Sequence, residues 1–325
     1  MKKARLILVG FGKIGRGVAE SIVKKRSHLM SLGYDLKVVA VCEVKGCVVD
    51  EKGIDLKRML SGETRWGSRK TVDVISGMEA DIVVEMTPGN IRDGEPGLSH
   101  IKAALKAGKH VVTSNKSPLA VAYHELQRQA CKNGLELKFE ATVGGAIPVI
   151  NTCRSELRAN GIMNIYGILN GTTNYILSKM SEEGVEFKVA LKEAQSLGLA
   201  EPDPSYDIKG IDSAVKLVIL ADAIMGEDIR LKDLNVVGVD SITSDAVELA
   251  KDHGFVIKLV GDVAAREVSP RLIPVEHPLN VPGNRNAILV ETDLANDITL
   301  IGAGAGPKET SSAVLGDILD VADRL

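Results

Sequence analysis

The 325-residue sequence predicts an α/β protein of two domains, and three observations lead to this prediction. Strand-like and helix-like segments alternate up to about residue 130, which is typical of a parallel sheet with helices on both faces. After residue 135 the sequence pattern changes, with a glycine-rich turn and then segments that look like the strands of a separate sheet. A second glycine-rich turn precedes the last helix. We therefore expect one domain over 1–135 with 302–325, and a second, α+β domain over 136–301.

The composition is that of an ordinary globular protein and argues against several classes of protein. Hydrophobic residues make up 45% and charged residues 26%, and the net charge of −3 gives no reason to expect a nucleic-acid partner. No uncharged apolar run reaches the roughly 18 residues that a membrane span needs. Because the four cysteines lack CxxC spacing, we expect no disulfide framework, no zinc site and a cytoplasmic location. These cysteines are Cys42, Cys47, Cys131 and Cys153.

The first strand and helix enclose a glycine motif. Arg5–Val9 is an apolar, β-like run, and a segment with helical apolar spacing follows the motif. Gly10 permits a tight turn, Gly12 lets a pyrophosphate approach the backbone, and Gly15 allows close helix–strand packing. The motif predicts a Rossmann-type dinucleotide-binding domain, although a purely structural turn has the same spacing. Its candidate cofactor contacts are Gly10, Phe11, Gly12, Lys13, Ile14 and Gly15.

The second strand, Leu36–Cys42, ends at an acidic residue. Glu43 at this position would hold the ribose hydroxyls of NAD. Basic residues follow at Lys45 and at Lys57–Arg58, and they would instead suit the 2′-phosphate of NADP. Each of these charges could equally be a solvated surface group. The sequence therefore leaves the choice between NAD and NADP open.

Two further strands end next to candidate site residues. Asp81–Met86 is followed by Thr87, and His110–Thr113 is followed closely by Lys116, with a helix over Ser99–Ala107 between the two strands. Ligands bind at the carboxyl ends of strands in sheets of this kind. We therefore expect Thr87 to contact the cofactor and Lys116 to meet both cofactor and substrate, although an isolated lysine is usually a surface residue.

The second domain begins near a glycine-rich apolar turn, Glu140–Pro148. Its expected strands are Ile165–Leu169, Val256–Val260 and Ala287–Glu291. The glycine-rich turn Gly302–Gly306 precedes a terminal helix over Ser311–Leu325, which suggests that the tail returns to the first domain. A terminal helix that packs elsewhere on the surface is the simpler alternative.

The densest group of charged residues runs from Glu201 to Lys216. Two prolines stiffen the start of this segment, so its first acidic residues lie on a loop. A helical pattern follows, in which Asp212 and Lys216 are four residues apart and project from one face. Lys216 then runs into an apolar stretch, where an ammonium needs a partner. The pair predicts a buried proton donor; the plainer interpretation is an exposed ion pair worth a few tenths of a kcal/mol.

Several motifs together identify a resemblance. They are Gly10-x-Gly12-x-x-Gly15, Ser114-Asn-Lys116, Glu140-Ala-Thr-Val-Gly, Asn170-Gly-Thr-Thr-Asn-Tyr-Ile, Leu199-Ala-Glu-Pro-Asp-Pro204, Gly210-Ile-Asp212 through Lys216, and Gly302-Ala-Gly-Ala-Gly306. In this order they resemble homoserine dehydrogenase, in its short form, over essentially the whole chain. The resemblance implies NAD(P)-dependent interconversion of L-homoserine and L-aspartate 4-semialdehyde, on the route to threonine and methionine. It also implies a catalytic domain that forms a homodimer.

The resemblance also implies roles for individual residues. Lys116 and Lys216 match catalytic lysines, with Lys216 the expected proton donor, and Asp212 matches the acid that positions it. Glu201 matches a substrate-binding acid, and Asp207 and Thr172 are further candidates for the substrate's ammonium and carboxylate groups. Thr87 and Gly306 match cofactor contacts. A monovalent cation, sodium for example, is expected on the loop containing Glu140, Val143, Gly145 and Ile147, mainly through backbone carbonyls.

Three alternatives to this function remain. A reductase of another amino-acid-derived aldehyde or imine could use the same fold. A non-catalytic nucleotide sensor would keep the glycine motif but would not need Glu201, Asp212 and Lys216 together. A semialdehyde-oxidising dehydrogenase would need a cysteine nucleophile, and neither Cys131 nor Cys153 has a persuasive partner. Because the sequence offers neither a kinase nor a C-terminal regulatory segment, we expect no threonine inhibition through such a domain.

Overall fold

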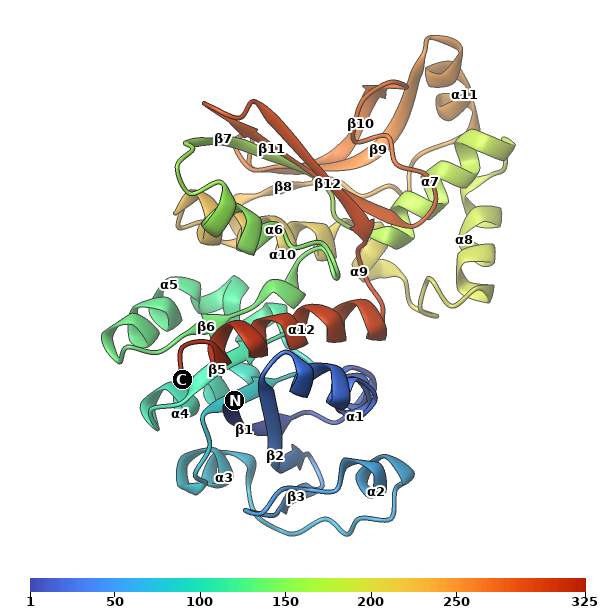
Figure 1. The fold of residues 1–325 in the computed structure, drawn as a ribbon. Coiled ribbons are helices and arrows are strands. Elements are labelled where there is room, and N and C mark those ends of the chain that lie inside the picture. Colours follow the sequence, from blue (N-terminus) through green and yellow to red (C-terminus); the bar gives the residue numbers. More distant parts are fainter. The chain divides into compact units, whose positions relative to one another are not determined.

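The computed structural model describes all residues, 1–325, and divides into two compact units (Figure 1). Unit 1 comprises Met1–Thr142 and Gly306–Leu325, and unit 2 comprises Val143–Ala305. The sequence placed the two boundaries slightly earlier, after residues 135 and 301. None of the helices is both long and apolar enough to cross a membrane.

Unit 1 is built on a six-stranded sheet with the order β3-β2-β1-β4-β5-β6. Neighbouring strands are parallel, except that β2 and β3 form an antiparallel hairpin. The strands are β1 (Lys2–Val9), β2 (Tyr34–Glu43), β3 (Gly46–Val49), β4 (Ile82–Glu85), β5 (His110–Thr113) and β6 (Leu137–Lys138). This order is that of dinucleotide-binding folds, and it brings the carboxyl ends of β1, β4 and β5 to one edge.

Helices cover this sheet and complete its core. They are α1 (Lys13–Ser31), α2 (Leu56–Ser61), α3 (Thr71–Gly77), α4 (Gly97–Lys106), α5 (Lys116–Lys132) and α12 (Pro307–Ala322), with a short 3₁₀ helix at Glu140–Thr142. Leu6 and Leu8 of β1 face a core shared with α1 and α12, and Ile7 on the opposite face is also fully buried. Burial on both faces explains why β1 is a continuous apolar run.

The C-terminal helix is an integral part of unit 1. α12 packs along α1, as the red and blue helices of Figure 1 show. Val314, Ile318 and Val321 are fully buried and belong to the same core cluster as Val18 of α1. At Gly17 of α1 a Cβ would lie 2.6 Å from Ser311 Oγ, so the absence of a side chain there lets the two helices approach closely.

The expectation for the cysteines was wrong for one pair. A disulfide joins Cys42 and Cys47, whose Cα atoms lie 4.2 Å apart. They are directly opposed in the register of the β2–β3 hairpin, so the pairing follows from strand register and not from a CxxC spacing. Cys131 and Cys153 are not part of a disulfide.

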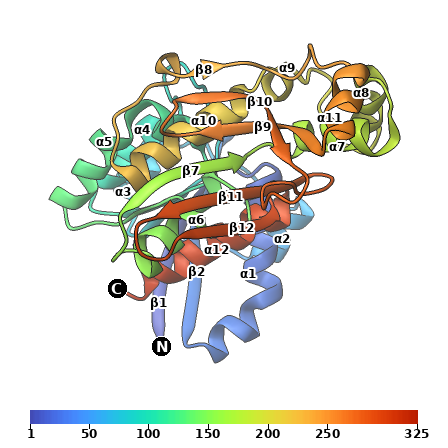
Figure 2. The same ribbon diagram turned by 90° about the horizontal axis from the view of Figure 1, so that it is seen from above.

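Unit 2 contains a second six-stranded sheet, with the order β12-β11-β7-β9-β10-β8. Its pairs are antiparallel, except that β8 runs parallel to β10. The strands are β7 (Ile162–Ile168), β8 (Asn235–Val236), β9 (Phe255–Asp262), β10 (Glu267–Pro274), β11 (Arg285–Thr292) and β12 (Asp297–Ala303). Figure 2 shows β7, β11 and β12 side by side, with β12 at the edge of the sheet.

The longer helices of unit 2 pack against this sheet, with α7 on β9 and β11 and α10 on β7, β9 and β10. The helices are α6 (Val149–Asn151), α7 (Gly171–Glu183), α8 (Phe187–Ser196), α9 (Ser205–Ile208), α10 (Ile211–Leu220) and α11 (Ser244–Asp252). Short π-helical turns follow α6 at Thr152–Glu156 and α10 at Ala221–Met225, and a 3₁₀ turn spans Leu231–Asp233.

One lysine is buried in the core of unit 2. Lys258 of β9 is 3% exposed, and its Nζ donates to Asn174 Oδ1 at 2.8 Å, to Ser178 Oγ at 2.9 Å and to Val281 O at 2.8 Å. Burial lowers the pKa of Lys258 to about 8. Two of the three acceptors fix α7 to β9, because Asn174 and Ser178 lie on successive turns of that helix.

Candidate active site

The glycine loop between β1 and α1 has the geometry of a pyrophosphate site. Gly10 has φ +89°, and a Cβ there would lie 2.7 Å from the backbone of Met86. A Cβ on Gly15 would lie 2.1 Å from Gly10 O, whereas one on Gly12 would meet nothing within 4 Å. Gly12 is also the N-cap of α1 and supplies no side-chain acceptor to the first-turn N–H groups. Gly10 and Gly15 are therefore required for packing, while the space at Gly12 suits an anion.

A hollow of about 450 Å³ lies beside this loop and is suited to the adenosine end of a dinucleotide. Glu43 borders it, with Oε1 accepting from Phe11 N–H at 2.7 Å and Oε2 from Val44 N–H at 3.0 Å. Trp66 also lines it, and the ammonium of Lys45 lies 4.5 Å from the centre of its ring. Sequence reasoning missed Trp66; its only mark is that it is the single tryptophan of the chain.

The turns after β4 and β5 carry Thr87 and Lys116, and they pack directly on each other. Lys116 opens α5, with Asn115 as N-cap accepting from Ser117 N–H at 3.1 Å. A Cβ on Gly89 would lie 2.2 Å from both Asn115 Oδ1 and Ser117 Oγ. Close approach at Gly89 therefore joins the two turns into one surface at the carboxyl edge of the sheet.

Gly306 begins the return of the chain to unit 1. It has φ +135° and caps the N-terminus of α12, where Pro307 is the first helical residue. Pro fits this position because its missing N–H would be unpaired there in any case. The predicted cofactor contacts Gly10–Gly15, Glu43, Thr87 and Gly306 thus all belong to unit 1.

Unit 2 holds the predicted proton donor. Lys216 Nζ donates to Leu169 O at 2.6 Å and lies 2.8 Å from Asp212 Oδ2, one turn earlier on α10. Lys216 is 6% exposed and Asp212 5%. The exposed surface pair that the sequence left open is therefore excluded. An ammonium held between a carboxylate and a carbonyl, and largely removed from water, is fixed in position for proton transfer.

Asn170 connects this pair to a second carboxylate. Its Nδ2 donates to Asp212 Oδ2 at 3.0 Å and to Asp207 Oδ1 at 2.7 Å, while its Oδ1 caps α7 by accepting from Thr173 N–H at 2.9 Å. Burial raises the pKa of Asp207, opposed by the hydrogen bond from Asn170, and the nearby charge of Asp212 raises it further. Asn170 was singled out only as part of a motif, and its role as the bridge follows from the structure.

The two remaining predicted substrate contacts are Thr172 and Glu201. Thr172 is close enough to Asp207 for a hydrogen bond that opposes the rise in the pKa of that carboxyl. Thr172 is buried, and its hydroxyl donates to Leu199 O at 2.8 Å. Glu201 is exposed, and only its backbone carbonyl is engaged, by Gln195 Nε2 at 3.2 Å. Its carboxylate makes no ion pair or hydrogen bond.

The expected cation loop spans the boundary between the units. Glu140 belongs to unit 1, where its N–H donates to Asp317 Oδ2 at 2.8 Å, and Val143, Gly145 and Ile147 belong to unit 2. Gly145 has φ +58°, and a Cβ there would lie 2.8 Å from Ala303 O. The chain has no group of three or more His, Cys, Asp and Glu side chains that could hold a metal ion.

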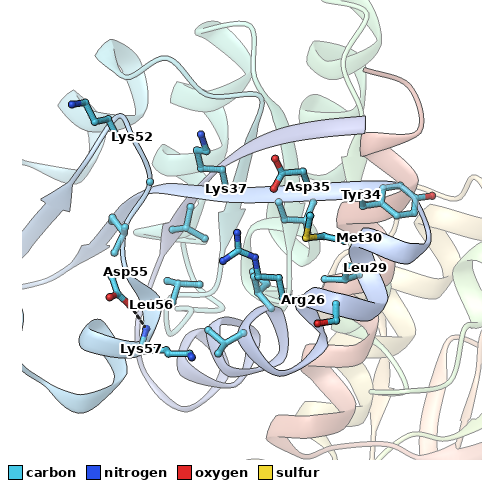
Figure 3. Close-up of a pocket in the computed structure, with 17 residues that line it drawn as sticks. Arg26, Leu29, Met30, Tyr34, Asp35, Lys37, Lys52, Asp55, Leu56 and Lys57 are labelled. Carbon is cyan, nitrogen blue, oxygen red and sulfur yellow. Dashed lines mark hydrogen bonds between the residues drawn. The ribbon is translucent and has the colours of Figure 1, made fainter. Parts of the chain in front are cut away.

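A larger hollow, of about 660 Å³, lies elsewhere in unit 1 (Figure 3). It is lined by the second half of α1, the start of β2 and residues 52–57, with Arg26, Lys37, Lys52 and Lys57 around it. The glycine loop follows the end of β1, whereas this hollow lies at the start of β2. Because β1 and β2 are parallel, the loop and the hollow lie at opposite ends of these strands. This hollow is therefore not part of the candidate cofactor site.

Comparison with known families covers both units. Residues 10–140 match the profile "Homoserine dehydrogenase, NAD binding domain", and residues 148–319 match the profile "Homoserine dehydrogenase". The chain belongs to the homoserine dehydrogenase family. Members of this family are NAD(P)-dependent oxidoreductases, and the Rossmann-type domain and separate catalytic domain predicted from the sequence are confirmed.

Some of the similar proteins match over nearly their full length. The enzyme of Methanocaldococcus jannaschii is 45% identical over 97% of this chain and 98% of its own. A crystal structure of a proposed homoserine dehydrogenase from Archaeoglobus fulgidus has a TM-score of 0.92 and 40% identity, over 98% of this chain and 99% of that one.

Relatives differ in their named cofactor. The homoserine dehydrogenase of Pseudomonas canavaninivorans, 35% identical over 99% of this chain and 97% of its own, is named NAD(+)-dependent. A hyperthermophilic archaeal homoserine dehydrogenase was solved with NADPH; it has a TM-score of 0.86 and 29% identity, over 99% of this chain and 98% of that one.

Proposed function

We propose that this chain catalyses the NAD(P)-dependent interconversion of L-homoserine and L-aspartate 4-semialdehyde. The observation that carries the proposal is the buried Lys216–Asp212 pair, 2.8 Å apart, in a chain of this family. Acid–base chemistry at an alcohol or aldehyde oxygen needs such a group, and a nucleotide sensor does not.

Lys216 is proposed to handle the proton. A bound nicotinamide dinucleotide would supply hydride to the aldehyde carbon and take it back in the reverse direction. As negative charge develops on the aldehyde oxygen, the ammonium of Lys216 stabilises it and gives up a proton. Asp212 and Leu169 O hold Nζ in place during this transfer. In the reverse direction the neutral amine of Lys216 accepts the hydroxyl proton of homoserine.

The substrate is a small zwitterion and needs groups of both signs. We assign its ammonium group to the carboxylates of Glu201 and Asp207, and its carboxylate to the turn that contains Thr172. Asp207 is held by Asn170 at 2.7 Å, which keeps it close to the catalytic pair. The exposed, unpaired carboxylate of Glu201 is available to a ligand.

Unit 1 is proposed to bind NAD or NADP. The glycine loop from Gly10 to Gly15 binds the pyrophosphate, and Glu43 lies at the ribose. Thr87 and Gly306 contact the rest of the cofactor. Lys116, at the first turn of α5, is the second catalytic lysine of this proposal. The open space at Gly12 supports the phosphate assignment.

The test follows absorbance at 340 nm with purified protein and L-homoserine, with NAD and NADP in separate wells. We expect reduced cofactor to appear only when homoserine is present. Absence of turnover with both cofactors, in protein that binds either of them, would contradict the proposed reaction. Other amino-acid-derived aldehydes, tested with NADH and NADPH, would then identify the alternative reductase.

We also propose a cytoplasmic homodimer formed through unit 2. The edge strand β12 supports this interface, because an unpaired strand edge can pair with a second chain and Ile301 on it is 50% exposed. Light scattering after gel filtration should give twice the chain mass of 34.6 kDa. A mass of one chain over a broad concentration range would contradict the dimer.

A monovalent cation is proposed at the loop of Glu140, Val143, Gly145 and Ile147. Backbone carbonyls and a carboxylate are hard oxygen ligands of the kind that sodium accepts. Turnover in sodium chloride should exceed that in choline chloride at equal ionic strength. Equal turnover in the two salts would remove the cation from the proposal.

A further inference from the structure

Glu85, the last residue of β4, is a buried carboxylate with no lysine or arginine partner. It is 0% exposed, and no lysine or arginine lies within ion-pair distance. The imidazole of His100 lies within ion-pair distance, with its Nδ1 3.7 Å from Glu85 Oε1, but this nitrogen makes no hydrogen bond. A buried acidic group is costly unless hydrogen bonds satisfy it, so its donors indicate what it does.

Those donors come from the two turns that carry predicted site residues. Glu85 Oε1 accepts from Thr87 N–H at 3.0 Å and from the Thr87 hydroxyl. The Thr113 hydroxyl lies 3.0 Å from Glu85 O and 3.2 Å from Glu85 Oε2, so its single proton is shared between these two oxygens. Thr113 Oγ1 in turn accepts from Asn115 N–H at 3.0 Å, at the residue that caps α5. One side chain therefore links the Thr87 turn to the start of the Lys116 helix.

This arrangement restricts what Thr87 can offer to a ligand. A hydroxyl has a single proton, and that of Thr87 is directed to Glu85. Its lone pairs remain, so Thr87 Oγ1 can only accept a hydrogen bond from outside. In sheets of this order the nicotinamide end of a dinucleotide lies near the carboxyl ends of the strands. The carboxamide NH₂ of nicotinamide is a donor that matches an acceptor there.

We propose that Glu85 is a positioning residue for the cofactor: it makes the Thr87 hydroxyl an obligate acceptor for the nicotinamide carboxamide and holds the Thr87 turn to the Lys116 helix. The inference rests on the proposed function only for the identity of the ligand. It concerns binding and not turnover, so the two can fail separately.

The experiment measures dissociation constants through the fluorescence of Trp66, the only tryptophan, which lies beside the hollow next to the glycine loop. The ligands are NADH and its analogue in which a methyl ketone replaces the carboxamide, so that the NH₂ donor is missing. The wild-type protein should bind NADH about tenfold more tightly than the analogue, as expected for one hydrogen bond in a dry site.

The variants locate the cause of this preference. Thr87→Val removes the acceptor and should bind both ligands equally. Glu85→Met keeps the length of the side chain but releases the Thr87 proton, and it should also lose the preference. Glu51→Met, an exposed glutamate of the same unit, is the matched control and should keep it. If Glu85→Met does not fold, as judged by its melting curve, the wild-type comparison still tests the inference, because equal binding of NADH and the analogue would overturn it.

Two results would overturn the inference. One is a wild-type protein that binds NADH and the methyl-ketone analogue equally. The other is a folded Glu85→Met variant that retains the full tenfold preference. A protein that binds NADH with the expected preference but does not oxidise homoserine would support this inference and contradict the proposed function.

Discussion

Lys216 Nζ and Asp212 Oδ2 lie 2.8 Å apart on one turn of α10, with both side chains more than nine-tenths buried. An i,i+4 pair on an exposed helix contributes a few tenths of a kcal/mol. In a dry site the same two groups are held rigidly and interact more strongly, at a desolvation cost that needs a compensating role. Proton transfer to the substrate oxygen is such a role.

Lys216→Ala should therefore lower kcat by about 100- to 10,000-fold, the usual contribution of a general acid. Binding of NADH should stay unchanged, because Lys216 belongs to unit 2 and the glycine loop to unit 1. Initial rates at 340 nm and the Trp66 titration measure the two quantities. Lys209→Ala, an exposed lysine in the same segment, is the control. Near-normal turnover in a folded Lys216→Ala protein would remove the assignment.

Asp207 should give a pH dependence to substrate binding. Its pKa is raised by burial, so on acidification it loses its charge at a higher pH than an ordinary aspartate. If it binds the ammonium of homoserine, the KM for homoserine should rise as the pH falls, starting above the usual Asp range. Asp207→Asn should show a high KM that no longer varies over this range. If the KM for homoserine rises at low pH to the same extent in Asp207→Asn and in the wild type, another group causes the rise.

Lys258 should make stability rise at alkaline pH. Its folded-state pKa of about 8 is below the unfolded value of 10.5, so between these pH values only the unfolded chain keeps the proton. The free energy of unfolding therefore gains up to about 3 kcal/mol from this group on going from pH 8 to 10.5, and nothing below pH 8.

Lys258→Met should lack this gain, and urea unfolding at pH 7.5 and 9.5 would show it. At neutral pH the variant should also be less stable, because three buried acceptors lose their donor. Lys188→Met, at an exposed position of α8, should follow the wild-type pH profile. A Lys258→Met protein with the full wild-type rise would contradict the burial argument.

The two charges beside the ribose position should act in opposite directions on cofactor choice. Glu43 would repel a 2′-phosphate, and Lys45, 4.5 Å from the Trp66 ring, would attract it. Glu43→Gln should shift the ratio of NADP to NAD dissociation constants about tenfold toward NADP, and Lys45→Met should shift it toward NAD. Ratios unchanged in both variants would place the 2′-phosphate elsewhere.

Gly12 and Gly15 should respond differently to the same substitution. Gly12→Ala adds a Cβ in open space, so the protein should fold normally and lose affinity for NADH. Gly15→Ala puts a Cβ 2.1 Å from Gly10 O, so it should lower the melting temperature. Thermal unfolding and the Trp66 titration separate the two effects. A Gly12→Ala variant with unchanged affinity would argue against phosphate binding at this loop.

Local patterns predicted the geometry that depends on neighbouring residues. The spacing of Asp212 and Lys216 and the glycine motif are short-range features, and the structure places both as the spacing requires. Glu85 could not be found this way. It ends an apolar run, and its importance depends on Thr113, which is 28 residues away and reaches it through strand pairing.

Dependence on distant residues also explains the other features that the sequence did not predict. The disulfide between Cys42 and Cys47 depends on the register of a hairpin that the sequence did not predict. Asn170 bridges two carboxylates 37 and 42 residues further along the chain, and the packing of α9 against both α7 and α10 helps to bring them together. Register and helix packing are long-range properties, which composition and periodicity do not contain.

The return of α12 to unit 1 also has a consequence for synthesis on the ribosome. The chain emerges from its N-terminus, so residues 1–142 appear first but lack the helix that fills their core. Residues 143–305 form a complete unit before that helix is made. We therefore expect the second sheet to reach its final state during translation. The nucleotide-binding half waits, with the apolar face of β1 and α1 uncovered, until residues 306–325 have also left the exit tunnel.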